Sequence, residues 1–190
     1  MSSSILASTK LAKIEGHPDN VAPAMFGGMV VSIMDEGVSY HDIVNVKEGI
    51  KFVPMIPDFK LSTKEARAVL PKEISIKDGV YNVGRVALMV TALSNGKYDL
   101  LKFACKDAFH ENYRSKLIKG FEEVKKEAYR VGALATYLSG AGPTIMAITS
   151  EKEENFKSNI EKFLKEKSLN WAVHELSIDT QGAFIIEGEE

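Results

Sequence analysis

The chain has 190 residues, of which 45% are hydrophobic, and a formal net charge of −2. This suffices to bury a core for one domain or one and a half, and the lack of a basic stripe excludes nucleic acid as the expected partner. Its single cysteine, Cys105, cannot form an internal disulfide, which favours a reducing compartment. Neither an apolar run of about 20 residues nor a signal-peptide pattern is present, so we expect a cytoplasmic protein.

The first third of the chain is expected to contain a short helix followed by strands. Pro18 suits the first turn of a helix that ends at Gly27-Gly28. The apolar run from Met29 to Met34 is typical of a buried strand, and Asp35-Glu36-Gly37 predicts a turn. Two further strands are predicted over residues 41–46 and 51–56.

The sequence changes in character near residue 60, and we place a boundary there, between segments 1–60 and 61–190. Ser62 and Glu65 form a capping box for a short helix. Asp78 is expected to cap a longer helix with an apolar stripe, which Asn95-Gly96 stops. The stripe comprises Val83, Val86, Val90 and Leu93.

Helices and strands alternate through the rest of the chain. Helices are predicted over 98–109, over 118–131 with a strong amphipathic pattern, and after a second capping box at Ser150 and Glu153. Strands are predicted over 135–139, 144–149, 171–178 and 183–186. The second segment is therefore expected to be a mixed α+β layer, with helices packed on a sheet.

A glycine-rich turn lies between two of these strands, at Ser139-Gly140-Ala141-Gly142-Pro143-Thr144. Small residues let the backbone approach a ligand closely, and consecutive N–H groups can form an anion-binding concavity. The same sequence also suits a tight connection between strands, because short glycine motifs are common.

A dense group of polar residues precedes the first apolar run, at Glu15, His17, Asp19 and Asn20. A polar loop in which Asp19 or Asn20 caps a helix explains it, and so does an active-site turn beside Gly27-Gly28. The four histidines of the chain show no spacing typical of zinc ligands.

Two arginines, Arg67 and Arg114, are candidates for anion binding, because a guanidinium binds carboxylates and phosphates in a bidentate fashion. Taken singly, either arginine is equally compatible with a surface position.

Taken together, these blocks resemble the homoserine kinases of the GHMP superfamily. The blocks occur in family order across nearly the whole chain: Glu15 to Ala24 with Gly27-Gly28, Ser62 to Arg67 with Leu70-Pro71, Asp107 with His110, Tyr113 and Arg114, Leu138 to Thr144, and Asp179 to Ala183. The first block is highly specific, whereas the glycine motif is shared across the superfamily. The resemblance implies a ferredoxin-like C-terminal domain preceded by part of a ribosomal S5 domain 2-like segment.

The resemblance also implies phosphorylation of L-homoserine by ATP with Mg²⁺, a step towards threonine. Glu15 corresponds to the Mg²⁺-binding carboxylate, and His17, Asp19 and Asn20 to the homoserine pocket. Asn20 stands where related kinases carry an aspartate base, which implies a route without a protein base because an amide accepts no proton at neutral pH. Arg67 and Arg114 would clamp the substrate carboxylate. Gly140, Ala141, Gly142 and Thr144 would support the phosphate site.

The sequence departs from the family pattern in one respect. The family's Pro-x-x-x-Gly-Leu-Gly-Ser-Ser nucleotide loop is absent, and such loops hold the triphosphate at a helix N-terminus. We therefore expect weak ATP binding by this chain, which could be a truncated form, the product of a misplaced start or a decayed gene, or half of a split enzyme. Exposed strand edges in residues 1–60 are expected to favour a homodimer.

Two alternatives stay open. The chain could be a non-catalytic amino-acid-binding or interaction module that keeps the arginine clamp, or a GHMP kinase for another substrate such as mevalonate or a sugar. Asn20 argues against mevalonate-type chemistry.

Overall fold

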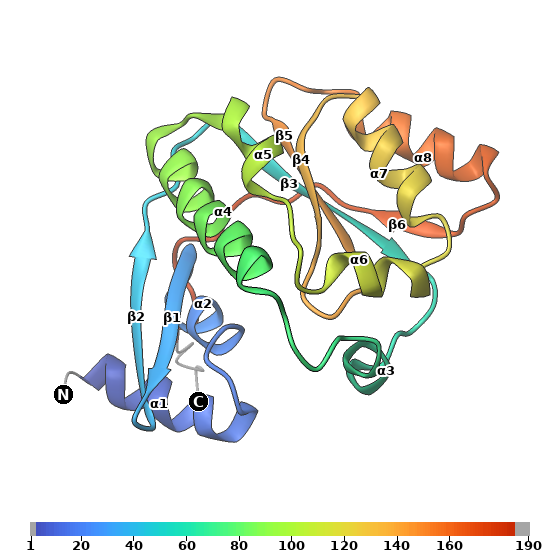
Figure 1. The fold of residues 1–190 in the computed structure, drawn as a ribbon. Coiled ribbons are helices and arrows are strands. Elements are labelled where there is room, and N and C mark those ends of the chain that lie inside the picture. Colours follow the sequence, from blue (N-terminus) through green and yellow to red (C-terminus); the bar gives the residue numbers. More distant parts are fainter. Residues whose placement is uncertain (1–2, 185–190) are drawn as a thin grey trace, which may run out of the picture. The chain divides into compact units, whose positions relative to one another are not determined.

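The computed structural model describes residues 3–184, and Figure 1 shows the elements in chain order. The helices are α1 (Ser3–Glu15), α2 (Val21–Phe26), α3 (Thr63–Ala68), α4 (Ile76–Asn95), α5 (Leu101–Ala104), α6 (Glu111–Arg114), α7 (Phe121–Arg130) and α8 (Phe156–Glu166). The strands are β1 (Met29–Asp35), β2 (Val38–Val44), β3 (Ile50–Pro57), β4 (Ala133–Leu138), β5 (Ile145–Ser150) and β6 (Trp171–Val173). Short 3₁₀ helices cover Tyr98–Leu100 and Ser115–Leu117.

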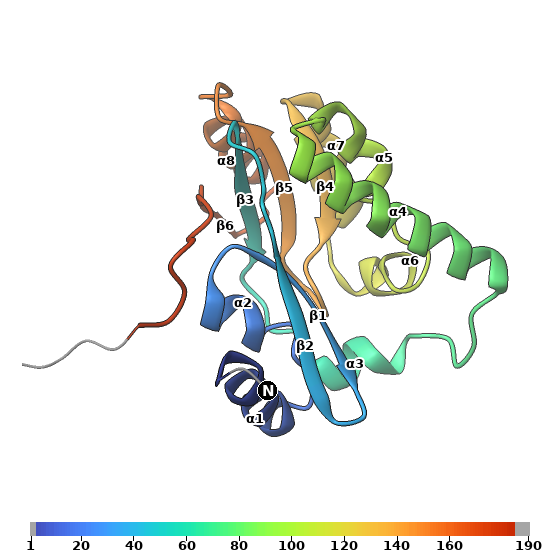
Figure 2. The same cartoon turned by 90° about the vertical axis from the view of Figure 1, so that its left-hand side faces the viewer.

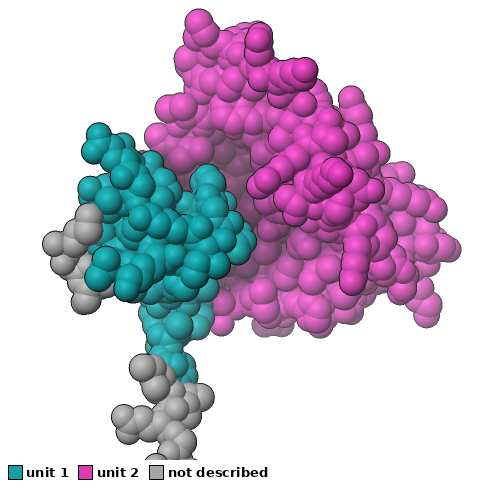
Figure 3. All heavy atoms as spheres, turned by 90° about the horizontal axis from the view of Figure 1, so that it is seen from below, with its two compact units in different colours: residues 1–46, 178–190 teal, residues 47–177 magenta. Residues whose placement is uncertain are grey.

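The chain folds into two compact units, which are coloured separately in Figure 3. The first unit comprises residues 1–46 and 178–190, and the second comprises residues 47–177. The sequence predicted a boundary near residue 60. The units divide after residue 46 instead, because β3 pairs with β5 and β6 of the second unit.

The first unit is built around a β-hairpin. Strands β1 and β2 pair antiparallel from Met29↔Val44 to Asp35↔Val38. The predicted turn joins them, with positive φ at Glu36 and Gly37, as a two-residue hairpin loop requires. Helix α1 contacts β2, where the backbone N–H of Ser39 donates to Thr9 Oγ1 at 3.0 Å.

Strand β1 was expected to be buried, and this prediction is wrong. Val31 and Ile33 of β1 are exposed, as is Tyr40, which pairs with Ile33 on the same face. Side chains alternate between the faces of a two-stranded sheet, and α1 contacts the face that carries Ser39. The other face keeps an apolar surface.

The second unit contains a four-stranded antiparallel sheet in the order β4-β5-β3-β6, which can be followed across Figure 2. In chain order, its first strand, β3, lies between the third and fourth strands, and helices connect β3 to β4 and β5 to β6. This is the split βαβ arrangement of a ferredoxin-like domain. It confirms the predicted α+β class.

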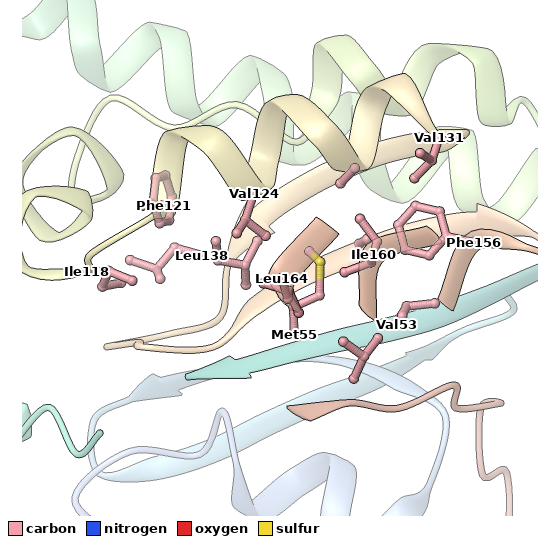
Figure 4. Packing of buried hydrophobic residues seen from close by; sticks show 14 residues of the cluster. Val53, Met55, Ile118, Phe121, Val124, Val131, Leu138, Phe156, Ile160 and Leu164 are labelled. Carbon is pink, nitrogen blue, oxygen red and sulfur yellow. The ribbon is translucent and has the colours of Figure 1, made fainter. Parts of the chain in front are cut away.

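The main core lies between one face of this sheet and helices α7 and α8 (Figure 4). Val53 and Met55 of β3 point into it and are fully buried, as are Val124 of α7 and Ile160 of α8. Helix α5 contacts β4, where Tyr137 points away from this core. Helices therefore pack on both faces of the sheet.

Helix boundaries depend on local capping. The Ser62–Glu65 capping box begins α3 as predicted, and Gly96 ends α4 in a left-handed conformation. Two predicted caps are wrong. Ser75 caps α4 by accepting the N–H of Asp78, and α8 begins at Phe156, where Asn155 occupies the N-cap position without a side-chain capping bond.

Other predicted elements differ in extent. The helix expected over 98–109 ends at Ala104, and the strand expected over 171–178 ends at Val173. The strand expected over 183–186 extends outside the described residues. No helix within residues 3–184 is long and apolar enough to cross a membrane.

Candidate functional site

The predicted site residues form two groups, one in each compact unit. Glu15, His17, Asp19 and Asn20 belong to the first unit. The two arginines and the glycine turn belong to the second unit.

The polar group of the first unit lies on the connection between α1 and α2. Glu15 is the last residue of α1, and Gly16, at φ 91°, turns the chain away from the helix. Pro18 is fully buried and anchors the connection, while the side chains of His17 and Asp19 are 75% and 65% exposed. His17 Nδ1 lies 3.5 Å from Asp19 Oδ1, so the two side chains attract each other when the imidazole is protonated.

Asn20 precedes α2 but does not cap it. Its side chain makes no capping hydrogen bond, although the residue occupies the N-cap position. The backbone N–H of Asn20 donates to Asp19 Oδ1 at 3.1 Å. The Asn20 amide therefore keeps both its donor and its acceptor for other contacts.

The C-terminal block of the sequence, Asp179 to Ala183, packs against the end of α2. The N–H of Gly28 donates to the Asp179 carbonyl at 2.6 Å, and the N–H of Ala183 donates to the Met25 carbonyl at 3.2 Å. A Cβ at Gly27 would lie 2.6 Å from the backbone N of Gly182, so only glycine fits there. This contact explains the Gly27-Gly28 pair as a close backbone approach.

Arg114, on the short helix α6, is about nine-tenths buried and ties two backbone segments together. Its Nε donates to the Ala66 carbonyl of α3 at 3.0 Å, and its Nη1 donates to the Gly140 carbonyl at 2.9 Å. The pKa of the Arg114 guanidinium is lowered chiefly by burial, while Asp107 opposes this shift and the like charge of Arg67 adds to it. The structure therefore brings the two predicted arginines within electrostatic range of each other, where an anion would relieve their repulsion.

A second set of hydrogen bonds positions α6. Asp107 Oδ2 accepts the N–H groups of His110 and Glu111 at 2.6 and 2.7 Å, and Asp107 Oδ1 accepts from Asn82 Nδ2 at 2.7 Å. Burial raises the pKa of Asp107, but these hydrogen bonds and the nearby His110 outweigh it, so the pKa lies below its ordinary value. Asp107 therefore holds α6 as a charged carboxylate.

Glu111 fixes the strand that leads into the glycine turn. Its Oε2 accepts the N–H of Leu138 at 3.0 Å, and its Oε1 pairs with Lys125 Nζ. Helix α6 thus holds the glycine turn through Glu111 at one end and Arg114 at the other.

The glycine turn is closed by its own backbone. The N–H of Ser139 donates to the Thr144 carbonyl, and the N–H of Gly142 donates to the Ser139 carbonyl, both at 2.9 Å. Gly140 and Gly142 have φ of 52° and 83°, which favour glycine. Within the described chain, the N–H groups of Gly140 and Ala141 make no hydrogen bond of this kind.

The described residues contain no group of three or more His, Cys, Asp or Glu side chains able to hold a metal ion. Mg²⁺ in kinases is usually bound by one or two carboxylates together with substrate phosphates. Glu15, which is exposed, fits the role of one such carboxylate but does not form a metal site alone.

A surface hollow of about 660 Å³ lies beside α3 and the glycine turn. Its lining is mainly apolar and includes Ile56, Phe59, Leu61 and Pro143, with Glu65 at α3. None of the predicted site residues lines this hollow.

Sequence reasoning missed Asn82 and Glu111 as supports of the site. Asn82 lies 25 residues before Asp107, so no local pattern connects them. The only usable signal was the Asp107–His110 spacing, which suits a carboxylate that caps a short helix.

Residues 89–166 match the family model described as "GHMP kinases C terminal". The chain is 65% identical over 176 residues to a homoserine kinase from Clostridium beijerinckii, which covers 93% of this chain and 59% of that protein. It also resembles the crystal structure of homoserine kinase from Cytophaga hutchinsonii, with a TM-score of 0.81 and 30% identity over 87% of this chain and 53% of that chain.

This chain carries a GHMP kinase C-terminal domain. It spans about three fifths of the length of the curated homoserine kinases that it matches. The fold is also shared with L. major mevalonate kinase, solved in complex with R-mevalonate, at a TM-score of 0.63 and 15% identity, covering 87% of this chain and 53% of that chain.

Proposed function

We propose that this chain contributes the homoserine-binding part of a homoserine kinase of the GHMP superfamily. The reaction moves the γ-phosphoryl group of ATP to the side-chain hydroxyl of L-homoserine, forming O-phospho-L-homoserine. The bond between the γ-phosphorus and the β–γ bridging oxygen breaks and ADP leaves. The observation that carries the proposal is that Arg114 donates to the carbonyl of Ala66, the residue next to Arg67, in a chain 65% identical to a homoserine kinase.

The two arginines suit an amino-acid carboxylate. Two nearby guanidinium groups repel each other, and a carboxylate between them turns this repulsion into attraction. Arg114 uses Nε and Nη1 on backbone carbonyls, which orients its remaining donor group before any ligand binds. Arg67 is exposed and its side chain is free to close on the ligand.

The polar group of the first unit is a separate part of the proposal, based on the family resemblance. His17 and Asn20 are proposed to contact homoserine, with Asp19 beside them and Asn20 near the reacting hydroxyl. Because the neutral Asn20 amide cannot accept the hydroxyl proton, that proton goes to the transferred phosphate or to solvent. Positioning and charge stabilisation then carry most of the rate enhancement.

When bound, Mg²⁺ neutralises charge on the ATP phosphates, and Glu15 is the residue proposed to hold it. The turn from Gly140 to Thr144 would support the phosphate site. The free N–H groups of Gly140 and Ala141 are its available donors.

A second candidate function is an amino-acid-binding module without catalysis. It needs only the arginines of the second unit, where Arg114 is held in place by the carbonyls of Ala66 and Gly140. Homoserine binding in the absence of measurable ATP binding would support this alternative. The fold shared with mevalonate kinase carries no argument for mevalonate as the substrate.

The test is phosphoryl transfer to L-homoserine, measured by ³¹P NMR. The chain should be assayed alone and joined to the part of the C. beijerinckii kinase outside the matched region. We expect O-phosphohomoserine from the joined form, and its absence from a joined form that binds both ATP and homoserine would refute the proposal.

Asn20→Asp provides an independent test of the route without a protein base. This change adds a carboxylate that can accept a proton, so it should alter the pH dependence of turnover more than homoserine affinity. Unchanged pH dependence would contradict the role of Asn20 at the reacting hydroxyl.

A further inference from the structure

Arg114 holds one end of a peptide group in the glycine turn. Its Nη1 donates to the Gly140 carbonyl at 2.9 Å. The other end of that peptide group is the N–H of Ala141, which makes no hydrogen bond within residues 3–184. Because the peptide unit is planar and trans, its C=O and N–H point in opposite directions. The guanidinium therefore fixes the carbonyl end and leaves the N–H end open to a ligand.

The orientation of this peptide group is set before any ligand binds. Arg114 is about nine-tenths buried, and its Nε donates to the Ala66 carbonyl at 3.0 Å. Two hydrogen bonds from one planar guanidinium fix the plane of that group. The turn is also closed by its own backbone, where the N–H of Gly142 donates to the Ser139 carbonyl at 2.9 Å. A ligand at the Ala141 N–H would therefore meet a donor that needs little ordering.

The charge of Arg114 also makes Ala141 a stronger donor. A peptide group carries partial negative charge on its oxygen and partial positive charge on its N–H. A guanidinium at the oxygen polarises the group further, so that the N–H at the other end binds an anion more strongly. The positive charge of Arg114 thus acts on an anion at Ala141 through one peptide group.

Arg67 lacks this connection to the turn. Its side chain is exposed, and among residues 3–184 it makes no hydrogen bond to the glycine turn. The two arginines, which share one role in the proposed carboxylate clamp, therefore differ in their relation to the turn.

We propose that Arg114 is a positioning residue for the phosphate as well as a clamp for the carboxylate. It orients and polarises the Gly140–Ala141 peptide group, whose N–H then donates to a phosphate oxygen. This inference rests on the proposed function, in which the turn supports the phosphate site.

The test is a titration of this chain with inorganic phosphate at constant ionic strength, followed by ¹⁵N–¹H NMR. Arg114→Met and Arg67→Met are the matched variants, because each removes one positive charge and keeps an unbranched side chain. The amide of Gly96, which already donates to the Ala92 carbonyl at the end of α4, is the internal reference and should not move.

We expect phosphate to shift the amide protons of Gly140 and Ala141 downfield in the parent. Arg114→Met should raise the Kd for phosphate at least about 5-fold, the equivalent of one ordinary hydrogen bond. Arg67→Met should raise it at most about 2-fold, because water and salt screen an exposed charge. Without phosphate, the Ala141 amide proton should move upfield in Arg114→Met while the amides of α7 and α8 keep their positions.

Arg114→Lys keeps the test open if Arg114→Met does not fold. Ala66 is fully buried and Gly140 is exposed, so the single ammonium should stay with the Ala66 carbonyl while water solvates the Gly140 carbonyl. The Kd for phosphate should then rise by a similar factor, in a protein that keeps the unfolding transition of Trp171.

Equal phosphate affinity in the parent and in the folded Arg114 variant would overturn this proposal alone. So would equal losses of affinity in Arg114→Met and Arg67→Met, which would mean that only total charge matters. A parent whose Gly140 and Ala141 amides do not respond to phosphate would also overturn the assignment of the turn to the phosphate site. The expected shifts without homoserine phosphorylation by the joined form would support this proposal and count against the proposed function.

Discussion

Replacing Arg114 with lysine should destabilise the second unit as well as weaken homoserine binding. Arg114 is about nine-tenths buried and donates to two carbonyls, those of Ala66 and Gly140. Lysine keeps the charge, but its single ammonium cannot reproduce two donors held in a planar fork. At least one charge-assisted hydrogen bond is lost, which costs about 1.5–3 kcal/mol of unfolding free energy.

Urea unfolding followed by tryptophan fluorescence measures this loss. Trp171, the only tryptophan of the chain, lies in β6 and therefore reports on the second unit. Arg130→Lys is the matched control, because Arg130 is exposed and pairs with Glu127 on the same helix, and it should change the midpoint much less. If Arg114→Lys unfolds within about 0.5 kcal/mol of the parent, the two backbone ties contribute little and the argument fails.

Three further predictions concern other parts of the chain. The lowered pKa of Asp107 stabilises the fold above the ordinary pKa of about 3.9, and this stabilisation is lost as the pH falls through the lowered value. Asp107→Asn should therefore be less stable than the parent at pH 7 and should lose less unfolding free energy on acidification. Urea midpoints at pH 7 and pH 3 measure this, with the exposed Asp99→Asn as control, and parallel acid losses in the parent and Asp107→Asn would contradict it. Burial raises the pKa of Cys105 to about 11, so between pH 9 and 11 the thiol ionises in the unfolded chain but not in the folded one. This should lower the unfolding free energy of the parent by up to about 1.4 kcal/mol per pH unit. The urea midpoint of Cys105→Ala should fall less steeply with pH, and equal slopes would mean that the thiol is accessible in the folded chain. The apolar face of β1–β2 should favour a homodimer that Ile33→Lys weakens and Ile14→Lys on α1 does not; a monomer at every concentration in light scattering would refute this.

The sequence predicted elements whose signals are local. The Glu36-Gly37 turn, the Ser62–Glu65 capping box and the Gly96 stop each depend on neighbouring residues, and the structure has all three. Helix α1 was missed because residues 3–15 carry no clear apolar stripe or cap.

The predictions were wrong where one sequence pattern was compatible with two structures. Ser75 and Asp78 both suit an N-cap, and the sequence does not show which of them caps α4. In the structure, Ser75 Oγ accepts the N–H of Asp78. The predicted apolar stripe of α4 is exposed at Val83 and Val86, because hydrophobic periodicity identifies a face but not what covers it.

The candidate site could be predicted as residue types but not as a network. The motifs identified Arg67 and Arg114, and the electrostatic coupling between their guanidinium groups appears only in three dimensions. Asn82 and Glu111 act on residues 25 to 27 positions away, and no sequence spacing encodes such contacts.

Calorimetric titration with L-homoserine tests whether the arginine pair belongs to a homoserine site. The parent, Arg67→Lys and Arg114→Lys should each be titrated as the form joined to the remaining part of the C. beijerinckii kinase. We expect binding by the parent and affinity about 10-fold to 150-fold lower for Arg67→Lys, equivalent to 1.5–3 kcal/mol, with Arg114→Lys weakened as well. Arg67→Lys and Arg114→Lys proteins that both bind L-homoserine as tightly as the parent would contradict it.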